Sequence, residues 1–248
     1  GIIPLSPTLD HVGPLCRSVR DLRSLLEVLA EPYSNGKSFI SSEHRLAGSK
    51  VGVLDSIPGS SCDTTIAEAF YRSVEDIKQA GAKIVRLSLP NLDLNDLRHA
   101  AFLLIESECA ETLSSSLKNH PEAYSKNLKS MLEYGRNLSS YRLSNVKEKL
   151  NRAKTAIINF FEVVDFLATP TAPQTAFHCT NPVPINQAEI TGLANISGIP
   201  AICLPSGIAP TGLPLSFQLM GRPYREGDLL NAAEDLQMIW GRPSLPIL

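Results

Sequence analysis

Two short serine-containing runs in this chain of 248 residues could supply a nucleophile. In the first, Pro58-Gly59-Ser60-Ser61-Cys62, two serines follow a glycine. Attack on a carbonyl carbon needs an activated nucleophile, a proton relay and N–H donors for the developing oxyanion. No Gly-Gly-Ser run follows to present backbone N–H groups, and Asp63-Thr64 is typical of a helix cap. We therefore predict a turn here and not a nucleophile.

The second run is Pro205-Ser206-Gly207. A nucleophile elbow has the pattern G-x-S-x-G and lies on a turn from a strand to a helix. Here a proline precedes the serine, and the flanking apolar runs indicate two strands. Ser206 is therefore predicted to be a turn residue that bonds to its own backbone.

The histidines and acidic residues do not complete a reactive set with these serines. Glu106 and Glu108 lie one to three residues before Cys109, and acidic residues beside a cysteine could suggest a cysteine protease. However, all three lie in a helical stretch with an ordinary polar face. The histidines have no recognisable Ser or Cys partner: His11, His44, His99, His120 and His178. We predict that this chain contains no catalytic residue.

The cysteines are scattered through the chain, with no Cys-x-x-Cys pair. They are Cys16, Cys62, Cys109, Cys179 and Cys203. A zinc site needs closely spaced Cys or His pairs. We predict reduced and mostly buried thiols, no metal, no cofactor and a cytoplasmic location.

Charge and hydropathy exclude several kinds of partner. The net charge of −2 and the pI near 6.2 give no electrostatic reason to expect binding to nucleic acid or an acidic membrane. No apolar run approaches the roughly 18 residues that span a bilayer. We expect no nucleic acid partner and no membrane span. The sequence leaves open whether the chain forms a homo-oligomer.

Two longer motifs, far apart in the chain, resemble one family. The first is Leu9-Asp10-x-x-Gly13-Pro14 within residues 1–14, and it is followed by Ser18-Val19-Arg20-Asp21-Leu22. The second is Asn195-x-x-Gly198-x-Pro200, which continues through residues 212–221. In this order they resemble the C-terminal half of amidase-signature hydrolases.

That family cleaves amides with a Ser, a cis-Ser and a Lys, all in a Gly/Ser-rich region upstream of the first motif. The resemblance implies that this chain begins just after that region and is inactive by itself. Residues 1–248 would then form a single α/β domain, a partial amidase domain without its N-terminal catalytic half. Asp10 would be scaffold, with its carboxylate accepting hydrogen bonds from loop N–H groups.

The resemblance also implies where the substrate binds. In family members the segment before the second motif lines the acyl pocket, and the loop at residues 169–173 lies near the same cleft. The implied substrate-binding residues are Thr171, Ile190, Thr191 and Leu193. An apolar wall with few hydroxyls favours a neutral, moderately apolar small amide. The alternative is that these residues only pack a helix.

Glutamyl- and aspartyl-tRNA amidotransferase subunits share this fold but select glutamine. Their pattern has an Asp at the position of Ala188 and an Arg pair at the positions of Lys129 and Ser130. Without those residues the charged ends of glutamine would have no partners, so we expect this chain to lie outside that subfamily.

A strand, a helix and a strand at residues 50–54, 65–79 and 83–87 form a βαβ pattern with a right-handed crossover. Helices are also predicted at residues 18–29, 189–197 and 225–240, and strands at 165–173, 201–204 and 215–220. This alternation predicts a layered α/β/α fold with a mixed sheet.

Residues 94–164 are predicted to be helical, with interruptions at Pro121 and Gly135. An apolar stripe ends this stretch: Leu143, Val146, Leu150, Ala153, Ile157, Phe161 and Val164. Its spacing predicts an amphipathic helix that packs on the sheet; a seam with a partner helix is the alternative.

A second interpretation of the whole chain is a non-catalytic C-terminal half or subunit that pairs with a separate catalytic chain. Such a half would expose sheet edges and core faces, which favour association.

Overall fold

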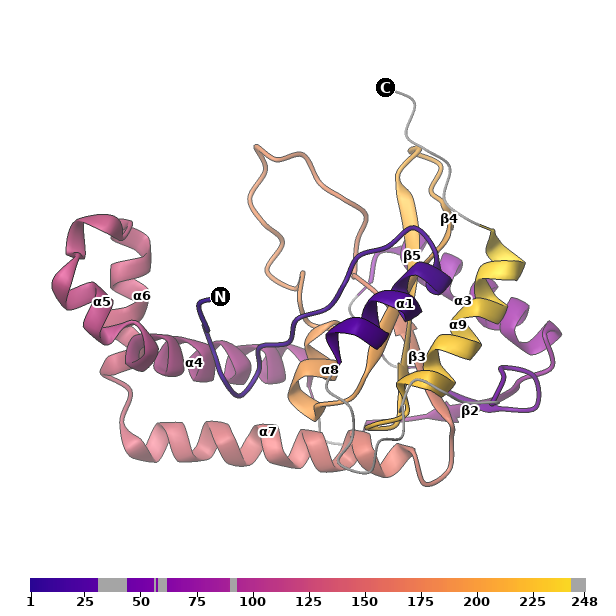
Figure 1. Ribbon diagram of the computed structural model, residues 1–248, viewed down its shortest axis with the longest axis horizontal. Coiled ribbons are helices and arrows are strands. Elements are labelled where there is room, and N and C mark those ends of the chain that lie inside the picture. Colours follow the sequence, from indigo (N-terminus) through magenta and orange to yellow (C-terminus); the bar gives the residue numbers. More distant parts are fainter. Residues whose placement is uncertain (31–43, 56, 58–61, 90–92, 242–248) are drawn as a thin grey trace.

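The computed structural model describes residues 1–30, 44–55, 57, 62–89 and 93–241. Its middle layer is a five-stranded sheet in the order β2-β1-β3-β5-β4 (Figure 1). The strands are β1 (Lys50–Leu54), β2 (Lys83–Leu87), β3 (Phe166–Pro170), β4 (Ala201–Ile208) and β5 (Pro214–Gly221). Strand β1 is parallel to β2 and β3, whereas β5 is antiparallel to β3 and β4. The predicted mixed sheet is confirmed.

The predicted βαβ unit is also confirmed. Strands β1 and β2 pair directly, with Lys50 opposite Lys83 and Leu54 opposite Leu87. The connecting helix is α3 (Thr64–Gln79), and its apolar residues at three- and four-residue spacing are buried on one side. Gly81 follows it with φ of +94°, a conformation that L-residues rarely adopt.

One face of the sheet is covered by α3, α1 (Val19–Leu29) and α9 (Glu226–Trp240) (Figure 1). The centre of this layer is aromatic. Phe217 of β5 stacks on Phe70 of α3 with ring centroids 5.5 Å apart, and the ring of Trp240 meets Phe217 edge-on at 5.3 Å. These side chains join apolar residues of β1 and β3 in one core cluster.

Helix α1 confirms the helix predicted at residues 18–29, and it begins after Ser18, whose hydroxyl oxygen accepts a hydrogen bond from the Asp21 N–H. Leu22 and Leu26 pack on the core, whereas Leu25 and Leu29 are exposed. The reason is that α1 contacts mainly α9, so only one side of the helix is covered.

The other face is covered by α4 (Leu94–Thr112), α7 (Ser140–Phe160) and α8 (Gly192–Ser197). The predicted stripe of α7 is buried from Val146 to Val164. The stripe belongs to one core cluster with Leu54, Leu167 and Met220 of the sheet, as predicted. It also packs against α4 and α8 of the same layer.

Short helices extend the far end of α4: α5 (Ser114–Asn119), the 3₁₀ turn η1 (Pro121–Ala123) and α6 (Lys126–Arg136). Pro121 starts η1, as an interruption there predicts. The second predicted interruption is confirmed close to Gly135, because α6 ends at Arg136 and α7 begins only at Ser140. A Cβ atom at Gly135 would collide with the Glu106 carbonyl of α4. This glycine is therefore also a close-approach position between α6 and α4.

Two predicted boundaries near the C-terminal motif differ from the structure. Helix α8 begins at Gly192 instead of residue 189. It ends at Ser197, as predicted, and Gly198 follows it with φ of +67°. Strands β4 and β5 are longer than predicted, so Ser206 lies within β4 at an irregularity between Pro205 and Gly207. The prediction that Ser206 is a turn residue was wrong because the hairpin turn lies further along the chain.

Between β3 and α8, residues 171–191 form a long loop that projects beyond the sheet (Figure 1). Among the described helices, none combines the length and apolar character needed to cross a membrane.

Candidate functional site

The loops that follow β1 and β3 meet at the carboxyl ends of these parallel strands. The Asp63 N–H donates to the Pro173 carbonyl at 2.8 Å, which ties the two loops together. In open α/β sheets, ligands bind beyond the carboxyl ends of the strands. Thr171 lies on one of these loops, so this edge is the candidate site. The predicted turn at residues 58–61 lies outside the described residues.

A polar row crosses β3, β5 and β4 beside this edge. The Gln218 side-chain amide donates to the Thr169 hydroxyl at 3.0 Å, and the Cys203 thiol lies 3.7 Å from the Gln218 carbonyl oxygen. Thr169 and Gln218 are buried. Because side chains alternate along a strand, both share the face of Leu167 and Met220, which α8 and α7 cover. The sequence analysis did not identify this row. The sign that could have revealed it is a polar residue within each of two mostly apolar strands, Thr169 in β3 and Gln218 in β5.

Thr171 continues this row. Its hydroxyl oxygen is buried and makes no hydrogen bond to a nitrogen or oxygen atom of the described residues. Its neighbour is the Cys203 thiol: burial raises the pKa of this thiol, and the nearby Thr171 side chain lowers it by less. Cys203 is exposed as a residue, but its sulfur lies against this row.

The structure separates the four predicted substrate-binding residues into two kinds. Ile190 and Leu193 have no exposed surface and belong to the core cluster under α8. Thr171 and Thr191 are half-buried and keep accessible surface. Both threonines could therefore touch a substrate, Thr171 only through atoms other than its buried hydroxyl oxygen, whereas Ile190 and Leu193 have no surface for such contact. The packing alternative holds for Ile190 and Leu193, and a role in substrate choice stays a prediction.

A buried ion pair lies next to these residues. Arg98 Nε of α4 is 3.4 Å from Glu189 Oε1, and the two side chains are 12% and 7% exposed. The Arg98 guanidinium also lies over the Phe102 ring. Sequence reasoning missed this pair because each residue appears in a polar stretch, and only the approach of α4 to the loop before α8 brings them together.

Cys62, which follows the Gly-Ser-Ser run, is a neutral thiol. Burial, followed by the charges of Asp63 and Glu189, raises its pKa to about 12. All five cysteines are free thiols, as predicted, but only Cys109 is buried, and Cys16, Cys179 and Cys203 are exposed. The prediction of mostly buried thiols was wrong because these residues lie in loops and on the uncovered face of β4.

The cysteine-protease arrangement is not formed on α4. Burial, with a smaller contribution from Asp10, raises the pKa of Cys109. Burial also raises the pKa of Glu106, although His99 and Arg142 lower it in part. Glu108 accepts hydrogen bonds from Ser6 and Thr8 and does not face the thiol as a base.

A serine–histidine contact that sequence reasoning did not identify joins Ser49 Oγ and His44 Nε2 at 2.9 Å. Ser49 is buried, and its hydroxyl donates to the Arg45 carbonyl at 2.5 Å. It precedes β1 and so lies at the opposite edge of the sheet from Thr171. A hydroxyl that is inaccessible and already donating is not available for attack.

The two family motifs touch each other in the fold. Asn195 of α8 donates through its side-chain amide to the Leu9 carbonyl at 2.8 Å, across 186 positions of sequence. Asp10 accepts from the N–H groups of Leu5 at 2.7 Å and Ser6 at 2.9 Å. The interpretation of Asp10 as a scaffold carboxylate is confirmed.

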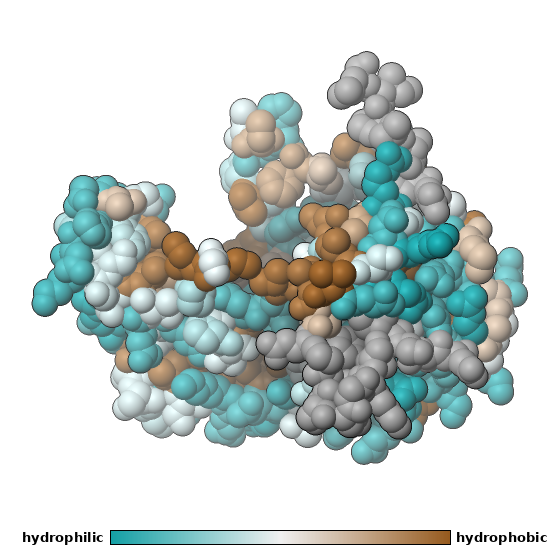
Figure 2. All heavy atoms as spheres, in the orientation of Figure 1, coloured by the Kyte–Doolittle hydropathy of each residue, from teal (hydrophilic) through white to brown (hydrophobic). Residues whose placement is uncertain are grey.

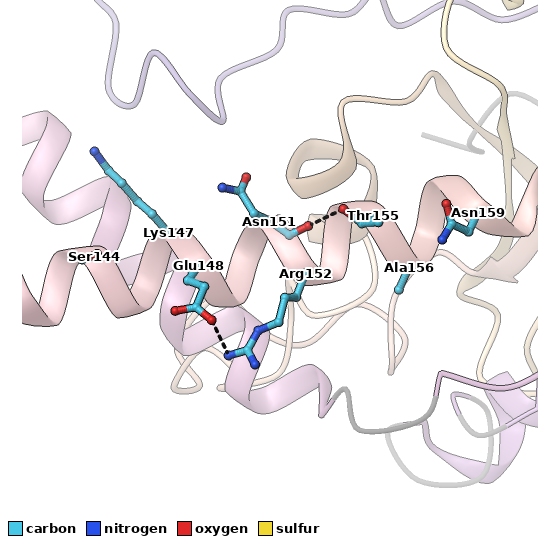
Figure 3. Close-up of a pocket in the computed structure, with 8 residues that line it drawn as sticks. All are labelled: Ser144, Lys147, Glu148, Asn151, Arg152, Thr155, Ala156 and Asn159. Atoms are coloured by element: carbon cyan, nitrogen blue, oxygen red, sulfur yellow. Dashed lines mark hydrogen bonds and ion pairs between the residues drawn. The ribbon is translucent and has the colours of Figure 1, made fainter.

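A hollow of about 670 Å³ lies along the polar face of α7, away from the candidate site (Figure 3). The residues that line it all come from this one helix, and Glu148 pairs with Arg152 at 3.7 Å. None of the predicted site residues lines it, and it brings no nucleophile to a base. In the part of the chain that the structure describes, no three His, Cys, Asp or Glu side chains gather to hold a metal.

Comparison with known proteins identifies the family to which this fold belongs. The Amidase family model matches residues 1–230. A 2-amino-5-chloromuconic acid deaminase of Comamonas testosteroni is 28% identical over 98% of this chain and 54% of its own length. A glutamyl-tRNA(Gln) amidotransferase subunit of Synechococcus sp. (strain CC9605) is 27% identical over 96% of this chain and 56% of its own length.

A crystal structure of an amidase superposes with a TM-score of 0.83 at 26% identity, covering 96% of this chain and 55% of that one. The chain thus spans about half the length of the relatives it matches. Overall identity does not separate the deaminase from the amidotransferase, so the subfamily expectation rests on Ala188, Lys129 and Ser130 alone. Since the family model covers nearly all of the sequence, this chain belongs to the amidase family.

Proposed function

We propose that this chain is the part of an amide hydrolase that shapes the acyl-binding wall, while the Ser, cis-Ser and Lys that break the carbon–nitrogen bond lie outside its 248 residues. The observation that carries the proposal is the family match over residues 1–230. The likeness to a solved amidase at 26% identity supports it further. Residues 1–248 would then be one partial α/β domain.

The chemistry of the described residues supports inactivity of the chain by itself. Amide cleavage needs a nucleophile whose proton a nearby base can remove. The thiols of Cys62 and Cys109 are held neutral, and the Ser49 hydroxyl is buried and donates to a carbonyl.

The proposed substrate is a small, neutral, moderately apolar amide. Thr191 would offer a hydroxyl to it, Thr171 would contact it through the rest of its side chain, and Ile190 and Leu193 would set the position of this wall from behind. The neighbouring Arg98 and Glu189 neutralise each other, which fits an uncharged acyl group. The free thiols and the modest net charge support a cytoplasmic location without nucleic acid as partner; a homo-oligomer is compatible with this function.

A second candidate is a non-catalytic half that pairs with a separate catalytic chain. It is favoured by the apolar side chains exposed in residues 1–15, where Ile2, Ile3 and Val12 each keep more than two thirds of their surface. Figure 2 shows hydrophobic residues gathered in a band over this N-terminal segment. The exposed alternate residues of β4 would add an uncovered sheet face.

The test compares this chain with a longer protein that contains it together with an upstream Gly/Ser-rich region. Both are assayed with 4-nitroanilides of neutral acyl groups. We expect hydrolysis only by the longer protein. Activity of the 248-residue chain that disappears in Ser60→Ala or Ser206→Ala would instead place the chemistry inside it.

The reading frame upstream of Gly1 separates the two candidates. A continuous frame that encodes a Gly/Ser-rich stretch and a lysine supports one enzyme. A separate gene whose product restores activity when mixed with this chain supports the pairing of two different chains.

A further inference from the structure

One carboxylate of α4 holds the turn at residues 5–10 in place. Glu108 Oε2 accepts from the Ser6 hydroxyl at 2.6 Å and from the Thr8 backbone N–H at 3.1 Å. Glu108 Oε1 accepts from the Thr8 hydroxyl at 2.5 Å. Three donors from two residues, 100 or more positions away in sequence, therefore converge on a single side chain.

The hydrogen bonds to this side chain favour its ionised form. Burial alone raises the pKa of Glu108, but the hydrogen bonds from Ser6 and Thr8, with the charge of Lys147, outweigh it and leave the pKa below its ordinary range. An ionised carboxylate only accepts hydrogen bonds and has room for several donors, whereas a Gln amide has one acceptor oxygen. Charge-assisted bonds of this kind are also the stronger ones.

The same turn has a second anchor on α8. Asn195 donates to the Leu9 carbonyl at 2.8 Å, and the side chains of Ser6 and Leu9 are buried. By contrast, the neighbouring Ile3 and Leu5 are exposed. Polar contacts, and not burial alone, thus fix the turn between α4 and α8, the helix that follows Thr191.

We propose that Glu108 is a positioning residue: by clamping Ser6 and Thr8 it fixes the N-terminal segment relative to α8 and its acyl-binding wall. This inference rests on the proposed function, in which the nucleophile precedes this segment in the chain. A displacement of about 1 Å between reacting groups can cost on the order of 100-fold in rate. The clamp would therefore act on the chemical step and not on substrate binding.

The first experiment uses the longer amide-hydrolysing protein. Glu108→Gln keeps the shape but removes acceptors, and Thr8→Val removes one donor. Each should lower kcat by about 10- to 100-fold with little change in KM. The double variant should be no worse than Glu108→Gln, because both changes break the same contact. Thr8→Ser, which keeps the hydroxyl, should restore kcat.

The matched control is Glu111→Gln, a change at an exposed carboxyl of the same helix that should leave kcat unchanged. Equal loss in this control, additive losses in the double variant, or a loss confined to KM would each overturn the positioning role. Thermal melts of every variant identify any loss that comes from unfolding.

The second experiment uses the 248-residue chain itself and measures hydrogen exchange at the Thr8 amide, a direct donor to Glu108. Exchange should accelerate in Glu108→Gln and stay the same in Glu111→Gln. Unchanged exchange in Glu108→Gln would contradict the clamp. If the longer protein hydrolysed no amide, the proposed function would be wrong. The exchange measurement would still show whether Glu108 holds the Thr8 amide. Faster exchange with an unchanged kcat would reduce Glu108 to a structural residue.

Discussion

The two faces of the sheet are covered by helices in different ways. Under α1, α3 and α9 the core is centred on Phe217, every strand residue in it is apolar, and buried polar residues such as Ser73 and Asn231 lie on the covering helices. Under α4, α7 and α8 the strands themselves carry buried polar side chains, which form the Gln218–Thr169 bond, and the Arg98–Glu189 pair lies in the same layer. Buried polar groups cost free energy unless they are paired, so they persist where geometry has to be specific. We therefore predict that the first face mainly stabilises the fold and that the candidate site lies on the second.

The largest effect is expected on the aromatic face. Phe217→Ala should lower the free energy of unfolding by about 3 to 5 kcal/mol, because it leaves a cavity between Phe70 and Trp240. Urea unfolding measures this loss. In the longer protein, remaining folded molecules should keep normal KM values. A changed acyl preference would break the division between the two faces.

The buried ion pair gives the next effect. Glu189→Leu leaves the Arg98 guanidinium buried without its counter-charge and should cost about 3 kcal/mol. The double variant Arg98→Met, Glu189→Leu should recover most of that loss, since an apolar pair of similar volume is often tolerated. Unfolding of the single and double variants measures the coupling. No recovery would mean that the pair does not act as a unit.

A smaller effect is expected at the proposed acyl-binding wall. Ile190→Val removes one methylene from a side chain without exposed surface and should cost about 0.5 to 1.5 kcal/mol. If Ile190 backs the wall, the longer protein should shift its kcat/KM ratio toward bulkier acyl amides by up to about 10-fold. An unchanged ratio would leave Ile190 as a packing residue only.

The Glu108 clamp predicts a pH dependence. Because the hydrogen bonds depress the pKa of Glu108, its stabilisation is fully present above the ordinary carboxyl pKa and is lost as pH falls through the lower, folded-state value. Melting temperatures of the wild type and Glu108→Gln should therefore converge on acidification from about pH 6 to about pH 3. A difference that stays constant over this range would contradict the ionised clamp. Glu111→Gln is the control.

The smallest effect concerns thiol reactivity and does not involve stability. With its pKa raised to about 12, Cys62 should be almost entirely protonated at about pH 8. Iodoacetamide should therefore label the exposed Cys16 and Cys179 well before Cys62. Mass spectrometry of a labelling time course measures the order. Early labelling of Cys62 would restore it as a reactive group beside the Gly-Ser-Ser run.

Local patterns in the sequence predicted most of the elements. Alternation and three- to four-residue spacing identified α3, the strands on either side of it and the buried stripe of α7. Local patterns did not reveal what a packing partner decides. Gly135 lies against the Glu106 carbonyl because α4 approaches it, and Leu25 and Leu29 are exposed because α1 contacts mainly α9.

The candidate site was predictable only in part. The family motifs pointed to the segment with Thr171 and Thr191, but not to Ile190 and Leu193 being enclosed in the core. Polarity gave no sign that Glu189 is buried. Whether a charged residue faces water or a partner depends on the elements that pack over it.

The sequence by itself determined the family and the order of the elements. The tertiary structure decided which polar groups meet. Glu108 with Thr8, Asn195 with Leu9 and Arg98 with Glu189 are all distant in sequence. The physical reason is that hydrophobic periodicity is a local property, whereas a hydrogen bond depends on the register with which whole helices dock.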